Sequence, residues 1–125
     1  MNDRPNALEL IRIADQTLAQ EILPGAQPEQ RYTLRMIANA LGIAARELES
    51  HDKNTGEEMR GLNLLYNEAQ NAAALHACNR QLALDIRHGK FESNTDQEAR
   101  LRLHLLTTAR AKLAAAYPKG LQETQ

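Results

Sequence analysis

The chain has 125 residues, the usual size of one domain, and its single cysteine excludes both an intrachain disulfide and a zinc site built from several cysteines. Fifteen lysines and arginines balance 16 aspartates and glutamates, and the net charge of -1 argues against a dedicated nucleic-acid binder or a polybasic membrane anchor. Valine is absent, whereas 20 alanines and 19 leucines are present, so helix-favouring residues dominate.

The first predicted helix spans residues 5–22. Asp3 is its expected N-cap, and Pro5 suits a first turn, where a missing N–H costs nothing. Leu10 and Ile13 widen its apolar stripe, so we expect this helix to be more buried than a plain surface helix.

The second predicted helix spans residues 28–50. Its apolar residues recur at steps of three and four, as on the buried face of a helix: Leu34, Ile37, Leu41, Ala44 and Leu48. The polar segment 51–54 then predicts a turn.

The third predicted helix spans residues 56–87. Thr55 and Glu58, three residues apart, predict a capping box at its start. No proline or glycine interrupts its middle, and asparagines gather there. Two alternatives therefore stand: one long helix, or a break near 67–71.

Signals for a helix end follow, and then signals for a new helix. Gly89 is expected to adopt a left-handed cap, and Phe91, the only phenylalanine, is expected to fold back as a hydrophobic plug. Thr95 and Glu98 predict a capping box that opens the last helix, residues 96–116.

Together these elements predict an all-α fold, a single up-and-down bundle of four to five antiparallel helices that forms one domain over residues 1–125. The alanine-rich stretch after residue 71 leaves a thin core, which a second copy of the chain could complete. We therefore expect a homodimer.

Several short segments resemble an uncharacterised bacterial family of all-helical domains of unknown function. They are Arg-Pro at 4–5, RMIANALGI at 35–43, RELE at 46–49, IRHG at 86–89 and Tyr-Pro at 117–118. Members of that family are often encoded beside aminoglycoside-phosphotransferase-like kinases and acyl-CoA dehydrogenases. The resemblance therefore implies a neighbouring kinase-like or acyl-CoA enzyme as partner, and it supplies no catalytic residues.

One face of the second predicted helix carries a candidate ligand site. Arg35, Asn39 and Arg46 share this face, and Gly42 between them opens a shallow notch, so the face could hold a carboxylate or phosphate. The structural alternative is an ion-pair network in which Arg46 pairs with Glu49 or with an acid on a neighbouring helix.

The remaining reactive residue types point to structure more than to chemistry. The four histidines form no HxxxH or ExxH pair on one face, and His104 is expected to be a semi-buried residue with satisfied hydrogen bonds. Cys78 lies among alanines, where thiols are usually small apolar fillers. We therefore expect no catalytic residues, no bound metal and no cofactor.

The sequence thus favours a non-catalytic helical interaction or accessory protein that acts with a phosphotransferase-like or acyl-CoA-metabolising enzyme. The alternative is a small-anion or acyl-ligand binding bundle that uses Arg35, Asn39 and Arg46. The N-terminus carries no secretory signal and no apolar run reaches the roughly 20 residues of a spanning helix, so a cytoplasmic location without membrane or nucleic-acid partners is expected.

Overall fold

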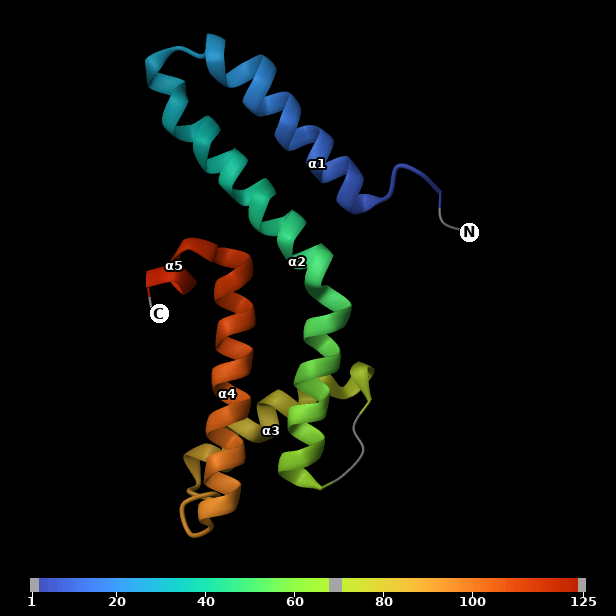
Figure 1. Ribbon diagram of the computed structural model, residues 1–125, viewed down its shortest axis with the longest axis vertical. Coiled ribbons are helices and arrows are strands. Elements are labelled where there is room, and N and C mark those ends of the chain that lie inside the picture. Colours follow the sequence, from blue (N-terminus) through green and yellow to red (C-terminus); the bar gives the residue numbers. More distant parts are fainter. Residues whose placement is uncertain (1–2, 68–70, 124–125) are drawn as a thin grey trace. The chain divides into compact units, whose positions relative to one another are not determined.

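A computed structural model describes residues 3–67 and 71–123, and that part of the chain is helical and contains no strand (Figure 1). The predicted all-α class is therefore confirmed. The elements in chain order are α1 (Ala7–Thr17), a π-helical turn (Leu18–Ile22), a 3₁₀ turn (Leu23–Gly25), α2 (Pro28–Tyr66), a second 3₁₀ turn (Ala72–Ala74), α3 (Leu75–Arg87), α4 (Thr95–Ala116) and α5 (Pro118–Glu123).

The start of α1 differs from the predicted one. The cap is Asn6, whose side chain accepts a hydrogen bond from the backbone N–H of Glu9 at 2.9 Å, while the Glu9 carboxylate accepts one from the backbone N–H of Asn6 at 2.9 Å. The reciprocal capping box satisfies two N–H groups that have no partner inside the helix. The expectation that Asp3 caps the helix was wrong, since this pair lies three residues further on.

The predicted turn at 51–54 is absent, because α2 continues through it as one helix of 39 residues. The Thr55–Glu58 capping box was therefore wrong as well: Thr55 lies inside the helix and its side chain is half-buried. Asparagine and aspartate weaken a helix interior by only about 0.7 kcal/mol each, so they do not stop a helix that packing supports.

The long-helix alternative for residues 56–87 does not describe the structure, which ends α2 at Tyr66 and begins α3 at Leu75. Asn67 adopts a left-handed backbone with φ 53°, a conformation that asparagine tolerates better than most residues and that commonly ends helices. The rest of the predicted break, 68–70, lies outside the described residues.

The end of α3 carries the glycine cap that the sequence predicts. Gly89 has φ 72°, its N–H bonds to the Ile86 carbonyl, and the Lys90 N–H bonds to the Asp85 carbonyl at 3.0 Å. These two bonds form a Schellman motif, which satisfies carbonyls at the helix end. The chain then turns back and buries Phe91, which is 3% exposed, so the predicted plug is confirmed.

Two details of the last helices correct the prediction. Asn94, and not Thr95, caps α4: its side chain accepts hydrogen bonds from the backbone N–H groups of Asp96 and Gln97 at 3.1 and 3.2 Å. The predicted end near Tyr117-Pro118 holds for α4, but Pro118 then opens α5, which the sequence analysis did not include.

The chain was expected to form one domain, and its contacts in the structure gather into two compact units. Among the described residues, unit 1 comprises 3–51 and 113–123, and unit 2 comprises 52–67 and 71–112. Each unit is described by itself below.

Unit 1 contains α1, the first part of α2, the end of α4 and α5 (Figure 1). The side chains of α1 are not deeply buried: no residue of this helix is enclosed by the rest of the unit, and Leu10 and Ile13 are 53% and 54% exposed. The expectation of an unusually buried first helix was therefore wrong, and its apolar stripe lies partly in solvent. An ion pair between Arg12 and Glu49, 2.9 Å long, joins α1 to α2.

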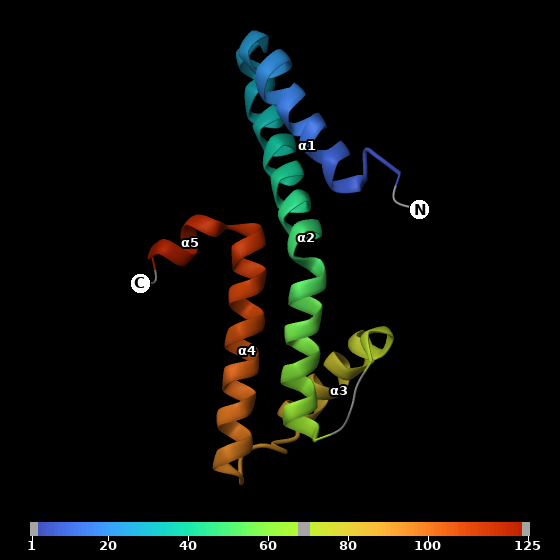
Figure 2. The same cartoon turned by 45° about the vertical axis from the view of Figure 1, so that its right-hand side comes forward.

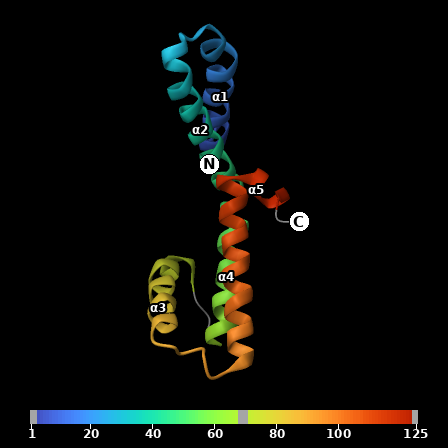
Figure 3. The ribbon, with the colours of Figure 1, turned by 90° about the vertical axis from the view of Figure 1, so that its left-hand side faces the viewer.

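Unit 2 holds the principal apolar core, formed by the second part of α2, α3 and most of α4. Leu62 is fully buried and packs with Leu65 of the same helix, Leu82 of α3 and Phe91 of the following loop. Within this unit α4 lies beside α2 and runs in the opposite direction (Figures 2 and 3). This core holds the second part of α2, α3 and most of α4 together.

Candidate functional site

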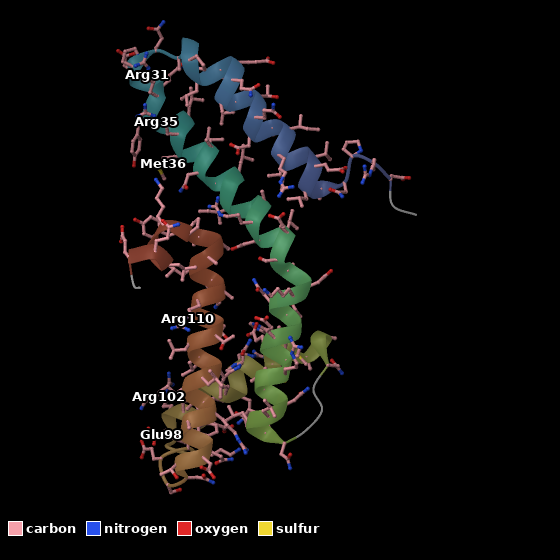
Figure 4. All side chains as sticks on the ribbon, viewed as in Figure 1. Arg31, Arg35, Met36, Glu98, Arg102 and Arg110 are labelled. Atoms are coloured by element: carbon pink, nitrogen blue, oxygen red, sulfur yellow. The ribbon has the colours of Figure 1, made fainter. Side chains whose placement is uncertain are left out.

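The three residues of the predicted ligand face on α2 differ in their exposure to solvent. Arg35 and Asn39 are exposed, and Figure 4 shows Arg35 projecting from the same stretch of α2 as Arg31. Arg46 is half-buried. In the described part of the chain, no hydrogen bond or ion pair joins any two of Arg35, Asn39 and Arg46.

Arg46 is engaged inside unit 1. Its Nε donates a hydrogen bond to the carbonyl oxygen of Ala115 at 2.7 Å, in the last turn of α4. A positive charge on such a carbonyl satisfies an acceptor without a partner in its own helix and complements the helix dipole. The notch expected at Gly42 is filled by the same guanidinium, since a Cβ there would lie 3.2 Å from the Arg46 Nη1.

The structural alternative for Arg46 has a different partner from the one anticipated. Glu49 forms its ion pair with Arg12, as noted above, and Arg46 binds a backbone carbonyl. Arg46 therefore links α2 to the end of α4 inside unit 1.

A polar cluster lies beside the core of unit 2. The Tyr66 hydroxyl donates a hydrogen bond to Asp85 Oδ2 at 2.6 Å, and Gln81 Nε2 donates to Asp85 Oδ1 at 2.9 Å. The Lys90 ammonium lies 3.4 Å from Asp85 Oδ2 and 5.0 Å from the centre of the Tyr66 ring. Both carboxylate oxygens of this buried side chain are therefore bonded, as a buried charge requires.

The protonation of the pair follows from these contacts. The hydrogen bond from Tyr66 lowers the pKa of Asp85 against the opposing effect of burial, with further help from Gln81 and Lys90. Burial and the neighbouring carboxylate raise the pKa of Tyr66. The carboxylate therefore stays charged and the phenol stays neutral, and this arrangement anchors α3 and its following loop to α2.

A groove of about 300 Å³ runs between α2 and α4 in unit 2. Residues from both helices line it at steps of three and four, among them Glu57, Arg60, Leu64, Arg100, Leu103 and His104. Leu64 and Leu103 are 66% and 67% exposed, the highest values among the exposed leucines of the described residues. The groove thus combines apolar walls with two guanidinium groups.

His104 forms the inner wall of this groove and is 5% exposed. Its imidazole lies against Gly61, where an added Cβ would overlap Nδ1 and lie 3.1 Å from Cε1. Burial lowers the pKa of His104, and the nearby negative charge of Glu58 partly opposes this effect. His104 is therefore more deeply buried than the semi-buried position predicted for it, and its side chain is neutral near pH 7.

A second shallow surface occupies α4 alone. It is lined by Ala99, Leu103 and Leu106 together with Glu98 and Arg102, which form an ion pair at 3.3 Å. Figure 4 shows Glu98, Arg102 and Arg110 on the side of α4 that faces away from α2. We call this surface, defined by Ala99, Leu103 and Leu106, the outer face of α4.

The described residues contain no group of three or more histidine, cysteine, aspartate or glutamate side chains that could hold a metal ion. Over the same ranges, no helix has both the length and the apolar character that crossing a bilayer demands.

The groove and the polar cluster could not be predicted from the sequence, because each depends on residues from different helices. Arg60 and Arg100 are 40 positions apart in the chain, and no local spacing relates them. Leu64 offered the one usable signal, since it lies between Leu62 and Leu65, which are both buried, and so cannot share their face.

When the sequence is compared with known protein families, residues 24–120 match the family described as "Domain of unknown function (DUF6285)". The chain belongs to this family. The DUF6285 match covers α2, α3 and α4 in full, including the groove and the polar cluster, and leaves out α1. Neither the search of curated proteins nor the search of solved structures found a match.

Proposed function

We propose that this DUF6285 protein is a non-catalytic helical interaction module that binds an enzyme partner through the outer face of α4. The observation that carries the proposal is the exposure of Leu103 and Leu106, 67% and 46%, on one contiguous surface of a helix. Apolar side chains gathered in this way, with charged side chains at their border, are typical of protein–protein contacts.

The border of this face supports the same function. The ion pair between Glu98 and Arg102 has side-chain exposures of 51% and 74%, so it lies in solvent at the edge of the apolar residues. Such rim charges contribute little to stability but influence the choice and orientation of a partner.

The identity of the partner draws on the resemblance described under Sequence analysis. A family encoded beside aminoglycoside-phosphotransferase-like kinases and acyl-CoA dehydrogenases has these enzymes as natural partners, so the proposal names a kinase-like or acyl-CoA-metabolising enzyme of a bacterial cytoplasm. We also propose that the chain is an up-and-down bundle of antiparallel helices and that two copies form a homodimer. The exposed apolar stripe of α1 supports a second copy, because Leu10 and Ile13 are more than half exposed.

The test is co-purification with the enzyme encoded next to this gene, using a matched pair of variants. Leu106→Asp changes the outer face of α4, whereas Leu105→Asp makes the same change at a neighbouring position that does not line this face. The two leucines are 46% and 45% exposed, so their substitution costs similar stability. We expect Leu106→Asp to abolish co-purification and Leu105→Asp to preserve it.

Two results would contradict the proposal. One is an enzyme that migrates independently of the wild-type protein at high concentration. The other is an equal loss in both variants while each keeps the wild-type circular dichroism spectrum. Light scattering on the same samples measures the oligomeric state, and a monomer at micromolar concentration would exclude the homodimer.

A further inference from the structure

The groove between α2 and α4 is a separate feature from the outer face of α4, although Leu103 lies at the border of both. Its two walls are the most exposed leucines of the described chain, Leu64 and Leu103. Its volume of about 300 Å³ lies at the lower end of the range of small-molecule sites, roughly 300–1,000 Å³. An occupant with a short apolar body would cover both leucines.

The charged residues along the groove indicate which charge the other end of such an occupant would carry. Arg60 comes from α2 and Arg100 from α4, and neither forms an ion pair within the described residues. Glu57 is the one carboxylate in the lining, and His104 contributes no charge because burial keeps it neutral. The lining therefore carries a net charge of +1, which a single negative charge would balance.

The buried end of the groove is closely packed. His104 packs against Gly61, and its own backbone carbonyl accepts a hydrogen bond from the Thr108 hydroxyl at 2.9 Å. Since the core of unit 2 holds both helices, the two guanidinium groups project from fixed backbones. Guanidinium is the cation best suited to a carboxylate, because its planar N–H groups match the two oxygens.

From this geometry we infer that the groove binds an aliphatic monocarboxylate, with the alkyl chain between Leu64 and Leu103 and the carboxylate held by Arg60 and Arg100. The inference goes beyond the proposed function, because it assigns a small-molecule site that a protein-binding role does not require.

The test is a calorimetric titration of the full chain with sodium octanoate below its micelle concentration. Octanamide keeps the chain and removes the charge, and acetate keeps the charge and removes most of the chain. We expect saturable binding of octanoate, with octanamide and acetate each weaker by about tenfold or more, because each lacks one of the two interactions.

Arginine variants locate the site. Arg60→Gln and Arg100→Gln should each weaken octanoate binding by about tenfold, the usual effect of removing a charged hydrogen bond. Arg110→Gln is the matched control, since Arg110 is on α4 but outside the groove and projects away from α2 (Figure 4). These three arginines are exposed, so their variants should keep the wild-type thermal unfolding curve.

The inference is overturned if octanoate shows no saturable binding, if octanamide binds as tightly, or if Arg110→Gln loses as much affinity as Arg60→Gln. Its failure is separable from that of the proposed function. Octanoate binding is measured without the enzyme partner, and Leu106, which tests the outer face of α4, does not line the groove.

Discussion

Two glycines of α2 should respond in opposite directions to the same substitution. At Gly56 an added Cβ meets no atom within 4 Å, whereas at Gly61 it would overlap the imidazole of His104. Both positions are inside one continuous helix, so alanine brings the same gain in helix propensity at each, about 1 kcal/mol. Any difference between the two variants therefore reports the packing of α4 on α2.

The size of the difference follows from the surroundings of His104. The ring is 5% exposed, and the added Cβ would lie 3.1 Å from Cε1 and 3.2 Å from Cγ, so the whole imidazole must shift. Overpacking of a filled interior costs about 1–3 kcal/mol. We expect Gly56→Ala to raise the free energy of unfolding by about 0.5–1 kcal/mol, and Gly61→Ala to lower it by up to about 2 kcal/mol once the propensity gain is subtracted from the overpacking cost.

Urea unfolding followed by circular dichroism measures both changes through the midpoint at constant slope. The double variant Gly61→Ala/His104→Ala tests the cause, because removal of the ring makes room for the methyl group. We expect a coupling free energy of about 1 kcal/mol or more between the two positions. Equal stabilisation by Gly56→Ala and Gly61→Ala would show that the two helices do not meet at this point.

Three further substitutions test other parts of the structure by the same urea assay. Leu62→Ala should lower the free energy of unfolding by about 3–5 kcal/mol, because the Leu62 side chain is fully buried. Leu64→Ala should change it by less than about 0.5 kcal/mol, because Leu64 is 66% exposed. Similar losses in the two variants would refute the core assignment. The folded state lowers the pKa of Asp85 below its ordinary value of 3.8, so the unfolded chain binds more protons in acid and stability falls as pH drops below about 5. Asp85→Asn should make the free energy of unfolding less dependent on pH below about 5. An unchanged pH dependence in this variant would argue against the contribution of the carboxylate. Arg46→Ala removes the hydrogen bond to the Ala115 carbonyl at the end of α4 and should lower the free energy of unfolding by about 0.5–2 kcal/mol. Arg35→Ala, at an exposed position of α2, should leave it nearly unchanged. Equal effects of the two substitutions would refute the capping role of Arg46.

Local signals predicted the parts of the fold that depend on a few neighbouring residues. The left-handed cap at Gly89 and the burial of Phe91 follow from the chemistry of a helix end, which is contained in about six consecutive residues. The helical class follows from composition. Caps were displaced by one residue at Asn94 and by three at Asn6, because several neighbouring polar side chains can serve and the backbone selects one of them.

The ligand face predicted on α2 shows the limit of arguing from one helix. Helical spacing correctly places Arg35, Asn39 and Arg46 on the same element, but spacing carries no information about what else approaches it. The carbonyl of Ala115 that binds Arg46 is 69 residues away in the chain. The same limit applies to the groove, whose two arginines come from different helices and whose lining becomes visible only when α2 and α4 are brought together.

The helical path of α2 between residues 57 and 64 determines which of its side chains line the groove. Glu57, Arg60 and Leu64 follow one another at steps of three and four, so at 100° per residue they share one face of the helix. This face depends on the local helix alone, and Lys53 precedes it in the chain. A proline at position 53 removes one backbone hydrogen bond and collides with the carbonyl four residues earlier, so it disturbs the helix before the groove begins. We therefore expect Lys53→Pro to leave octanoate binding unchanged while the buried core of unit 2 still folds. A loss of affinity as large as that in Arg60→Gln would show that the alignment of these side chains depends on the helix before residue 54.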